Sequence, residues 1–272
     1  MRKWIAVVAF LSLITIPAIS EQKQVLEQDL TVYVDPSGSD NNPGTENEPF
    51  QTIQKGVYYI TSFDTSIYQA KVKLADGSYN EQVILGYYSG QWPVTLEGNP
   101  ANPGNVHIYQ SDKPTIQGYY DRYWCLNGVK LSNSGGYPSI QADHATIQLR
   151  NILFGDCPGA PMIYVVDRGW VYFLDDIDVD GDANQFIYVD NQSYVNTGSV
   201  TVTFLNTPTF AIDTVRVIGA QMDCENTTFT GSVIGRRFWI DFHGKVYTNN
   251  QGQNWIPGSI AGGIGSMYAT YY

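Results

Sequence analysis

The sequence has 272 residues, of which 43% are hydrophobic and 15% are charged, and its formal net charge is −11. This length allows one large all-β domain or two small ones, and the hydrophobic content is sufficient for a substantial core. The negative charge argues against binding to a phosphate backbone, which needs clustered Lys and Arg. Nucleic acid is therefore not an expected partner.

The first 20 residues, MRKWIAVVAFLSLITIPAIS, have the pattern of a secretory signal peptide. Arg2 and Lys3 precede an apolar stretch, and Ala18 and Ser20 are small residues at the positions that a signal peptidase reads. The apolar stretch is shorter than the roughly 20 residues that span a bilayer. We therefore expect a secreted or extracellular protein with no stable membrane span after cleavage, and a flexible leader over residues 21–30.

The next stretch, VYVDPSGSDNNPGTENEPFQTIQKGV over residues 32–57, predicts a strand, a loop and a short helix. The loop is rich in Gly, Pro, Asn, Asp and Ser, which favour turns. Pro49 suits the first turn of a helix. The residues that would form one apolar stripe on this helix are Phe50, Ile53, Val57 and Ile60. Two strand–turn–strand patterns follow, over residues 71–85 and 92–110.

From about residue 120 a degenerate repeat begins. The repeated segments are CLNGVKLS, QLRNILFG, FLDDIDVDG, TFLNTPTF and DCENTTFTG, aligned on Gly128, Asn151, Asp176, Asn206 and Asn226. A repeat of this length predicts stacked units, because one unit cannot bury its apolar face alone. Helical repeats would need a period of about 3.6, and a propeller blade needs about 40 residues. A parallel β-helix remains, with the helix near Pro49 capping its first coil.

The opening of the chain resembles that of right-handed parallel β-helix proteins of the pectate-lyase-like superfamily. The matching residues in YVDPSGSDNNPGTENEPFQTIQKGV are Asp40, Asn42, Gly44, Pro49, Phe50, Thr52, Ile53 and Gln54. The segment KVKLADGSYNEQV is similar to the coil that follows in those proteins. The resemblance implies an all-β, single-stranded right-handed parallel β-helix over residues 31–234, with an irregular Gly-rich C-terminal cap and tail over 235–272.

The segment GRRFWIDFHGKVYTNNQGQNWIPGSIAG, Gly235–Gly262, is similar to the ends of β-helix proteins encoded by phages and prophages. This resemblance implies a tail-spike or tail-fibre-like protein, with a homotrimer as one arrangement and a virion tail appendage as the alternative location. The leading functional hypothesis is recognition of a glycan or cell-surface polysaccharide without catalysis. One alternative is a polysaccharide lyase or glycoside hydrolase acting on acidic or surface polysaccharide, and another is a structural appendage subunit.

Two aromatic clusters, LGYYSGQW and GYYDRYW, are candidate glycan-binding loops, because sugars stack on aromatic faces while polar groups bind their hydroxyls. Their candidate binding residues are Trp92, Tyr119, Tyr120, Asp121, Arg122 and Trp124. For catalysis, Arg122, Arg150 and Arg168 are candidate bases. Asp167 and Asp190 lie about one coil apart and are a candidate carboxylate pair for glycosidic hydrolysis.

The run DDIDVDGDAN contains Asp176, Asp178 and Asp180 in the spacing of a calcium loop. Ile187 stands where an EF-hand needs a bidentate Glu, so this is no EF-hand. The alternatives are a Ca²⁺ site built with a neighbouring coil, and a structural role within the repeat, which we expect. No cofactor is therefore expected to be required. The three cysteines, Cys125, Cys157 and Cys224, are expected to be small buried hydrophobic residues.

Overall fold

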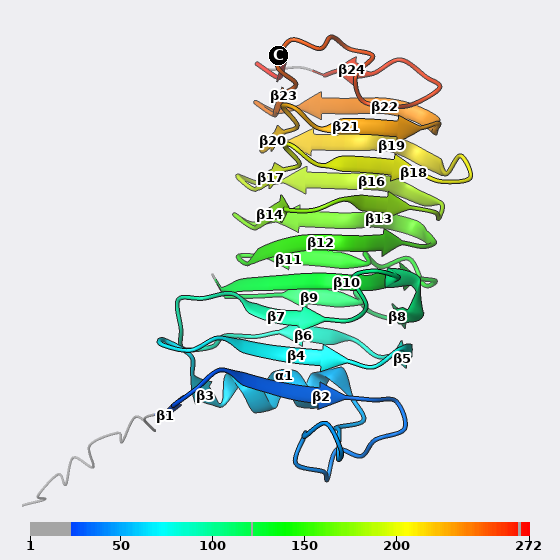
Figure 1. Cartoon of the computed structure of the whole chain (residues 1–272). Helices are drawn as coiled ribbons and strands as arrows, with labels where there is room; N and C mark the ends of the chain where they lie inside the picture. Colours follow the sequence, from blue (N-terminus) through cyan, green and yellow to red (C-terminus); the bar gives the residue numbers. More distant parts are fainter. Residues whose placement is uncertain (1–22, 121, 266–267) are drawn as a thin grey trace, which may run out of the picture.

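Short strands with alternating buried and outward side chains stack in parallel around a common core (Figure 1). In β4, for example, Val72 and Leu74 are buried while Lys71 and Lys73 face outward. The computed structural model describes residues 23–120, 122–265 and 268–272. It forms a parallel β-solenoid of about 8 turns, which confirms the predicted fold class. The predicted signal peptide lies outside the described residues.

Three walls run along the solenoid. Wall A contains β2 (Leu30–Val34), β4 (Ala70–Leu74), β7 (Val94–Glu97), β10 (Tyr123–Asn133), β12 (Thr146–Phe154), β14 (Trp170–Phe173), β17 (Tyr194–Asn196), β20 (Gln221–Asp223), β23 (Lys245–Tyr247) and β25 (Thr270–Tyr271). Wall B contains β5 (Gly77–Asn80), β8 (Val106–Gln110), β15 (Ile177–Val179), β18 (Thr201–Phe204) and β21 (Thr228–Gly231), and the long strands β10 and β12 join it to wall A.

Wall C is a separate sheet. Its strands are β6 (Val83–Leu85), β9 (Ile116–Gly118), β11 (Ile140–Asp143), β13 (Cys157–Val166), β16 (Ala183–Asp190), β19 (Thr209–Ile218), β22 (Ile234–Asp241) and β24 (Gly263–Ile264). The remaining elements are β1 (Gln24–Val25), which pairs with β3 (Phe63–Asp64), the helix α1 (Ile53–Thr61) and a 3₁₀ turn at Pro103–Asn105.

The core lies inside the walls and is continuous from α1 to the last coils. In its middle the ring of Phe186 contacts those of Phe154, Phe173, Phe204 and Phe210, which come from its own coil and the coils on either side. The three cysteines are free and buried, as expected. Among the described residues, no helix is long and apolar enough to cross a membrane.

Helix α1 closes the N-terminal end of the solenoid, and the predicted apolar stripe is buried. The helix begins at Ile53 rather than near Pro49. Asp40 accepts hydrogen bonds from the backbone N–H groups of Gln51 (3.0 Å) and Thr52 (2.9 Å), which holds the preceding residues outside the helix. Thr52 is the N-cap, and Glu81 accepts bonds from the N–H groups of Ile53 and Gln54. These acceptors satisfy donors that every helix N-terminus leaves free.

Both ends of the predicted β-helix differ from the expectation. Within the expected leader, Gln24–Val25 form strand β1 and Leu26 is buried. At the other end, the boundary expected at residue 234 falls in β22, and β23 continues the wall beyond it.

The expected repeat is also only partly correct. Gly128, Asn151 and Asp176 do align, because Val129 pairs with Ile152 and Ile152 with Ile177. The next partner of Asp176 is Thr201, whose N–H donates to the Asp176 carboxylate, so the expected alignment on Asn206 is wrong.

Candidate functional site

A row of polar and aromatic side chains runs along the outside of wall C. Its members alternate with buried residues in each strand, so they face away from the core. In register order the row consists of Gln117, Gln141, Tyr164, Tyr188, Arg216 and Trp239. Successive members are about 4.8 Å apart, the spacing of neighbouring strands. We call this the wall C row.

A buried carboxylate holds two arginines at this row. The register of β19 jumps between Thr209 and Asp213, which leaves Ile212 exposed and pairs Asp213 with Arg236 on β22. The Asp213 side chain is fully buried, and it accepts hydrogen bonds from Nε of Arg216 (2.8 Å) and from Nε of Arg236. A buried charge needs such partners, because removing it from water unpaired is costly.

Both arginines remain partly open to solvent, with exposed side-chain fractions of 23% for Arg216 and 30% for Arg236. Each guanidinium uses its Nε toward Asp213. Among the described residues, no other hydrogen bond of either guanidinium is found, so its NH₂ groups are available to a ligand. The carboxylate therefore fixes two forked donors on the outer face of wall C.

Aromatic rings flank the two arginines. The Arg236 guanidinium lies 4.7 Å from the centre of the Trp239 ring, and that of Arg216 lies 6.0 Å from the Tyr188 ring. The rings of Tyr164 and Tyr188 are 5.1 Å apart. The Tyr188 hydroxyl donates to Asp190 (3.2 Å); burial, aided by the Asp190 charge, raises the pKa of Tyr188 to about 12. Tyr188 is thus a neutral hydrogen-bonding group at ordinary pH.

The surface of wall C is hollowed at two places, one on the row and one beside Arg236. One hollow of about 270 Å³ is lined by residues that include Gln141, Pro161, Tyr164 and Tyr188. The other, of about 350 Å³, is lined by residues that include Ile212, Gly235, Arg236 and Ile260. The first hollow shares Gln141, Tyr164 and Tyr188 with the row, whereas the second contains none of the six members of the row and includes Arg236. Arg236 thus borders one hollow directly, and Arg216 is the register neighbour of Tyr188, which lines the other.

The register partner of Asp213 on the preceding coil is Gln185, which is also buried. A two-carboxylate mechanism needs a second Asp or Glu within about 5–10 Å. The position that would bring such a group beside Asp213 is occupied by an amide. The arrangement favours binding of an anion, and stabilisation of negative charge, over glycosidic hydrolysis by paired carboxylates.

The predicted aromatic loops are only partly exposed. Tyr120 and Trp92 are exposed, and the ring of Tyr119 lies 5.9 Å from that of Tyr120. Trp124 is fully buried; its ring packs edge-on against Tyr88 and its Nε1 donates to the carbonyl of Gly86. Its expected role in stacking on a glycan is therefore wrong, because its face is inside the coil.

The charged residues beside these aromatics, Asp121 and Arg122, were predicted to bind the hydroxyl groups of a glycan. Arg122 stacks on Tyr87, with 4.3 Å from the guanidinium to the ring centre. Asp121 lies outside the described residues. Glycan binding by the exposed members of the two loops stays a prediction.

The other predicted site residues do not converge on one centre. Arg150 lies on wall A, paired with Asn127, while Arg168 lies at the corner between walls C and A, with Nη2 3.2 Å from Nε2 of His144. Asp167 and Asp190 lie on adjacent coils, and both accept hydrogen bonds from Asn191. The Asn191 side-chain amide donates to Asp167 and its backbone N–H to Asp190. Their catalytic role stays a prediction.

The three aspartates of the DxDxDG run hold coils together. Asp176 accepts from the N–H of Thr201 (2.8 Å) and Asp180 from the side-chain amide of Asn206 (2.6 Å). Asp178 is paired in register with Leu153 and Thr203. Within the described parts of the chain, no group of three or more His, Cys, Asp or Glu residues is placed to hold a metal ion.

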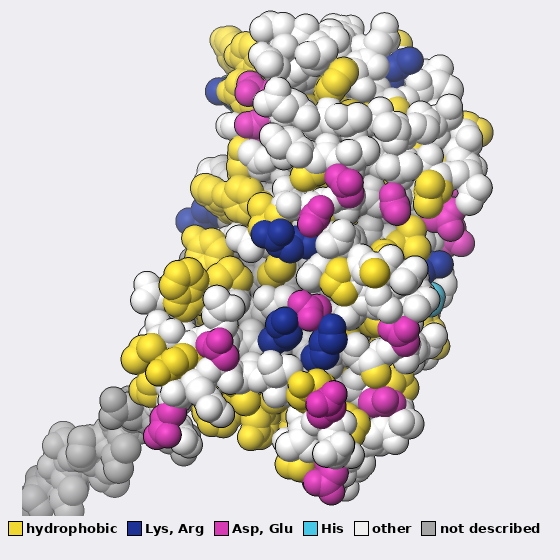
Figure 2. All heavy atoms as spheres, viewed as in Figure 1, with side chains coloured by type: hydrophobic (Ala, Val, Ile, Leu, Met, Phe, Trp, Pro, Cys, Tyr) yellow, Lys and Arg dark blue, Asp and Glu magenta, His cyan; other side chains and the backbone are white. Residues whose placement is uncertain are grey.

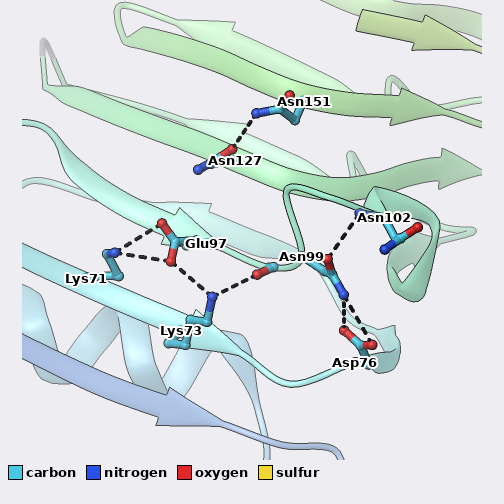
Figure 3. A network of polar contacts seen from close by, with 9 residues as sticks. Lys71, Lys73, Asp76, Glu97, Asn99, Asn102, Asn127 and Asn151 are labelled. Atoms are coloured by element: carbon cyan, nitrogen blue, oxygen red, sulfur yellow. Dashed lines mark hydrogen bonds and ion pairs between the residues drawn. The ribbon is translucent and has the colours of Figure 1, made fainter. Parts of the chain in front are cut away.

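A second charged cluster, two lysines that share one carboxylate, lies on wall A (Figure 3). Glu97 accepts hydrogen bonds from Nζ of Lys71 (3.0 and 3.1 Å) and Nζ of Lys73 (3.0 Å), and Lys73 also donates to the carbonyl of Gly98. The charge count is the same as for Asp213 and its two arginines, but an ammonium group lacks the planar fork of donors with which Arg matches a carboxylate.

Sequence reasoning missed Asp213, Arg216, Arg236 and Trp239. The available signal was the presence of charged residues within otherwise apolar strands, separated by about one coil: Asp213 and Arg236 are 23 residues apart. A single coil period brings such residues together in a β-helix.

The sequence matches no family model, and no curated protein matches it. The structure does have similar solved neighbours. A pectin methylesterase from Aspergillus niger superposes with a TM-score of 0.50 at 12% identity, over 92% of this chain and 84% of that one. The fold is shared with a pectin methylesterase. The Escherichia coli protein YbhC superposes with a TM-score of 0.53 at 13% identity, over 95% of this chain and 81% of that one. At such identities the likeness establishes the fold alone, and it gives no support to the tail-spike hypothesis.

Proposed function

We propose that this protein is an enzyme that acts on an acidic polysaccharide bound along the wall C row. The observation that carries the proposal is the pair of partly exposed guanidinium groups fixed by the buried Asp213. Arg presents a planar fork of donors that matches a carboxylate, and pre-orientation lowers the entropy lost on binding. Trp239 and Tyr188 supply ring faces for the sugars on either side.

The reaction that we favour is cleavage of an ester at the acid group of the sugar. A guanidinium held near an ester carbonyl stabilises the negative charge that develops on its oxygen in the transition state. Asp213 is the carboxylate that both arginines share. If a substrate draws one guanidinium outward, the freed Asp213 oxygen can act as a base: it takes a proton from a water that attacks the ester carbonyl, and the alkoxide leaves with that proton as methanol when its C–O bond breaks, so the sugar keeps a carboxylate. A solved neighbour is named as a pectin methylesterase, which supports this choice over glycosidic hydrolysis.

A second candidate is recognition of the same acidic chain without catalysis. It is favoured by the complete burial of Asp213 and by Gln185 in the adjacent register position. Location outside the cell would suit either function and remains a proposal, as does any oligomeric assembly.

The test is incubation of the purified protein with methylesterified pectin and with polygalacturonate. Released methanol, new reducing ends and unsaturated products are measured separately. We expect methanol release, reduced roughly 10- to 100-fold in Arg236→Gln, since a hydrogen bond to a charged group is worth about 1.5–3 kcal/mol. Lys113→Gln, which removes one positive charge from an exposed residue, is the matched control and should keep full activity.

Other outcomes separate the candidates. Binding of polygalacturonate that Arg236→Gln abolishes, without any product, would favour recognition over catalysis. Reducing ends or unsaturated products would replace ester cleavage by cleavage of the sugar chain. Absence of both products and binding would refute the proposal.

A further inference from the structure

A second group of aromatic side chains lies on wall A, around the corner from the Asp213 site. Trp170 on β14 pairs in register with Tyr194 on β17, and Tyr172 follows two residues along β14. The three rings contact one another, with centre-to-centre distances of 5.5 Å for Trp170–Tyr194, 6.1 Å for Trp170–Tyr172 and 6.0 Å for Tyr172–Tyr194. Together with Gln192 and Gln221 they line an open groove of about 540 Å³, which we call the Trp170 groove.

The rings of this groove are not needed to fill the core. Val171, Phe173 and Val195 alternate with them and are buried, whereas 45% of Trp170 is exposed. Figure 2 shows hydrophobic side chains gathered along the side of the molecule where β14 and β17 lie. An exposed cluster of large aromatics is costly in water unless a partner covers it, and such clusters mark binding sites.

On wall A, the column of outward-facing residues that contains Trp170 and Tyr194 is longer than the groove itself. The register continues from Tyr123 through Thr146 and Trp170 to Tyr194 and Gln221, and Tyr123 is also exposed. The ligand surface therefore runs over several coils parallel to the solenoid axis. This shape suits an extended chain, whereas a stable contact with a second copy would need about 800 Å² on each partner, far more than five residues offer.

The polar groups that line the groove are neutral, and the charges next to it are of both signs: Asp223 lies beside Tyr194, and the exposed Lys245 is the register partner of Gln221. The groove lining contains two side-chain amides, Gln192 and Gln221, and no Lys or Arg. The Tyr194 hydroxyl accepts from the Asn196 amide (3.0 Å) and lies 3.4 Å from the Asp223 carboxylate, to which it donates. Amides and carboxylates bind hydroxyl groups, while a carboxylate beside the groove repels an anionic ligand.

We infer that the Trp170 groove is a second carbohydrate site, which binds a neutral, hydroxyl-rich sugar chain by stacking on Trp170, Tyr172 and Tyr194. Its chemistry is opposite to that of the wall C row, where two arginines favour an acidic chain. The inference does not depend on the proposed function, because the two surfaces lie on different walls. Such a site would hold the protein on a mixed polysaccharide whose neutral and acidic regions alternate.

Affinity electrophoresis and calorimetry with soluble neutral polysaccharides test the inference. The probes are galactan, mixed-linkage β-glucan, xylan and galactomannan, with polygalacturonate as the acidic comparison. We expect at least one neutral probe to bind, and Trp170→Ala to weaken it about tenfold. Tyr137→Ala, at an equally exposed aromatic away from the groove, should leave binding unchanged, as should Arg236→Gln.

Failure to bind any neutral probe would overturn the inference, as would equal affinities of Trp170→Ala and Tyr137→Ala. If Trp170→Ala does not fold, Trp170→Leu replaces it, because leucine keeps apolar bulk but has no flat ring. Unchanged affinity of Trp170→Leu for the neutral probe would also refute stacking. If Arg236→Gln abolished neutral binding as well, the two surfaces would be one site and the inference would be wrong. Loss of ester cleavage in Arg236→Gln, with binding of the neutral probe retained, would show that the two proposals concern separate sites.

Discussion

Asp213 and Arg236 are register partners on adjacent coils, and the Asp213 carboxylate is buried between Arg236 and Arg216. The pair lies where β19 departs from a regular register, which exposes Ile212 and brings a charged residue into a buried position. A buried ion pair is a poor way to gain stability compared with apolar packing. We therefore interpret the cluster as a device that orients two arginines for a ligand.

Asp213→Ala should destabilise the protein by about 3–5 kcal/mol, because it leaves two guanidinium groups without their shared partner. Chemical denaturation of wild type and variant measures this difference. Asp190→Ala is the matched control: Asp190 is a partly exposed wall C carboxylate, and its loss should cost far less. A change below about 1 kcal/mol in Asp213→Ala would show that the arginines are well solvated without the carboxylate.

Ile53→Asp should cost several kcal/mol, because it buries a carboxylate without a partner under α1. Ile53 is fully buried, whereas Tyr58 on the same helix is 60% exposed. Tyr58→Asp is therefore the control and should change stability little. The denaturation midpoints of both variants are the measurement, and equal midpoints would mean that α1 does not seal the first coil.

The stacked fold could be predicted because apolar alternation and turn residues recur with each coil. The alignment of Gly128 with Asn151 was correct, and both have positive φ, which Gly and Asn tolerate. Asn206 also has positive φ, but it follows β18 at the corner between walls B and C. A coil has several corners of this kind, so the residue type alone does not say which corner it occupies.

The site could not be predicted because the exposure of a strand residue depends on which of the two alternating faces of the strand it occupies. Tyr123 and Trp124 are neighbours, yet Tyr123 is exposed and Trp124 is buried. A shift of one residue exchanges the two faces of a strand. On wall A, Trp170 lies in the same outward-facing column as Tyr123. The exposed aromatic surface therefore follows the column of Tyr123, and Trp124 faces the core. At Asp213 the irregular register of β19 removed the alternation altogether.

The Lys71–Glu97–Lys73 cluster makes stability depend on pH. Burial raises the pKa of Glu97, but hydrogen bonds from Lys73 and Lys71 outweigh it and hold the pKa below its ordinary value. The ionised form is thus favoured by folding, so the contribution to stability is present above the pKa of an unfolded Glu and is lost as the pH falls through the folded one.

We expect Glu97→Gln to be less stable than wild type at pH 7, by about 1 kcal/mol or less since the lysines are partly exposed. The difference should shrink as the pH falls below the pKa of an unfolded Glu, about 4.3, and should vanish below the lower pKa of folded Glu97. Denaturation at several pH values measures it. High salt should reduce the difference at pH 7 through screening. A difference that persists unchanged in acid would show that packing, and not charge, is responsible.

Calcium should have little effect on stability. Asp176 and Asp180 already accept hydrogen bonds from Thr201 and Asn206 on the next coil, which leaves fewer oxygens for an ion. Burial raises the pKa of Asp178, and the nearby charge of Asp176 adds to this rise. The ionised form of Asp178 is therefore disfavoured by folding, and its cost is felt above the pKa of an unfolded Asp.

Thermal melting in excess Ca²⁺ and in excess chelator tests this prediction, with Asp178→Asn as the informative variant. A bound ion at 100 times its Kd would add about 2.7 kcal/mol, a shift that melting curves resolve easily. Without an ion, Asp178→Asn should be as stable as wild type at pH 7 or slightly more so, because it removes a disfavoured charge. A rise in melting temperature with Ca²⁺ that chelator reverses, and that Asp178→Asn abolishes, would instead show that the three aspartates form a metal site.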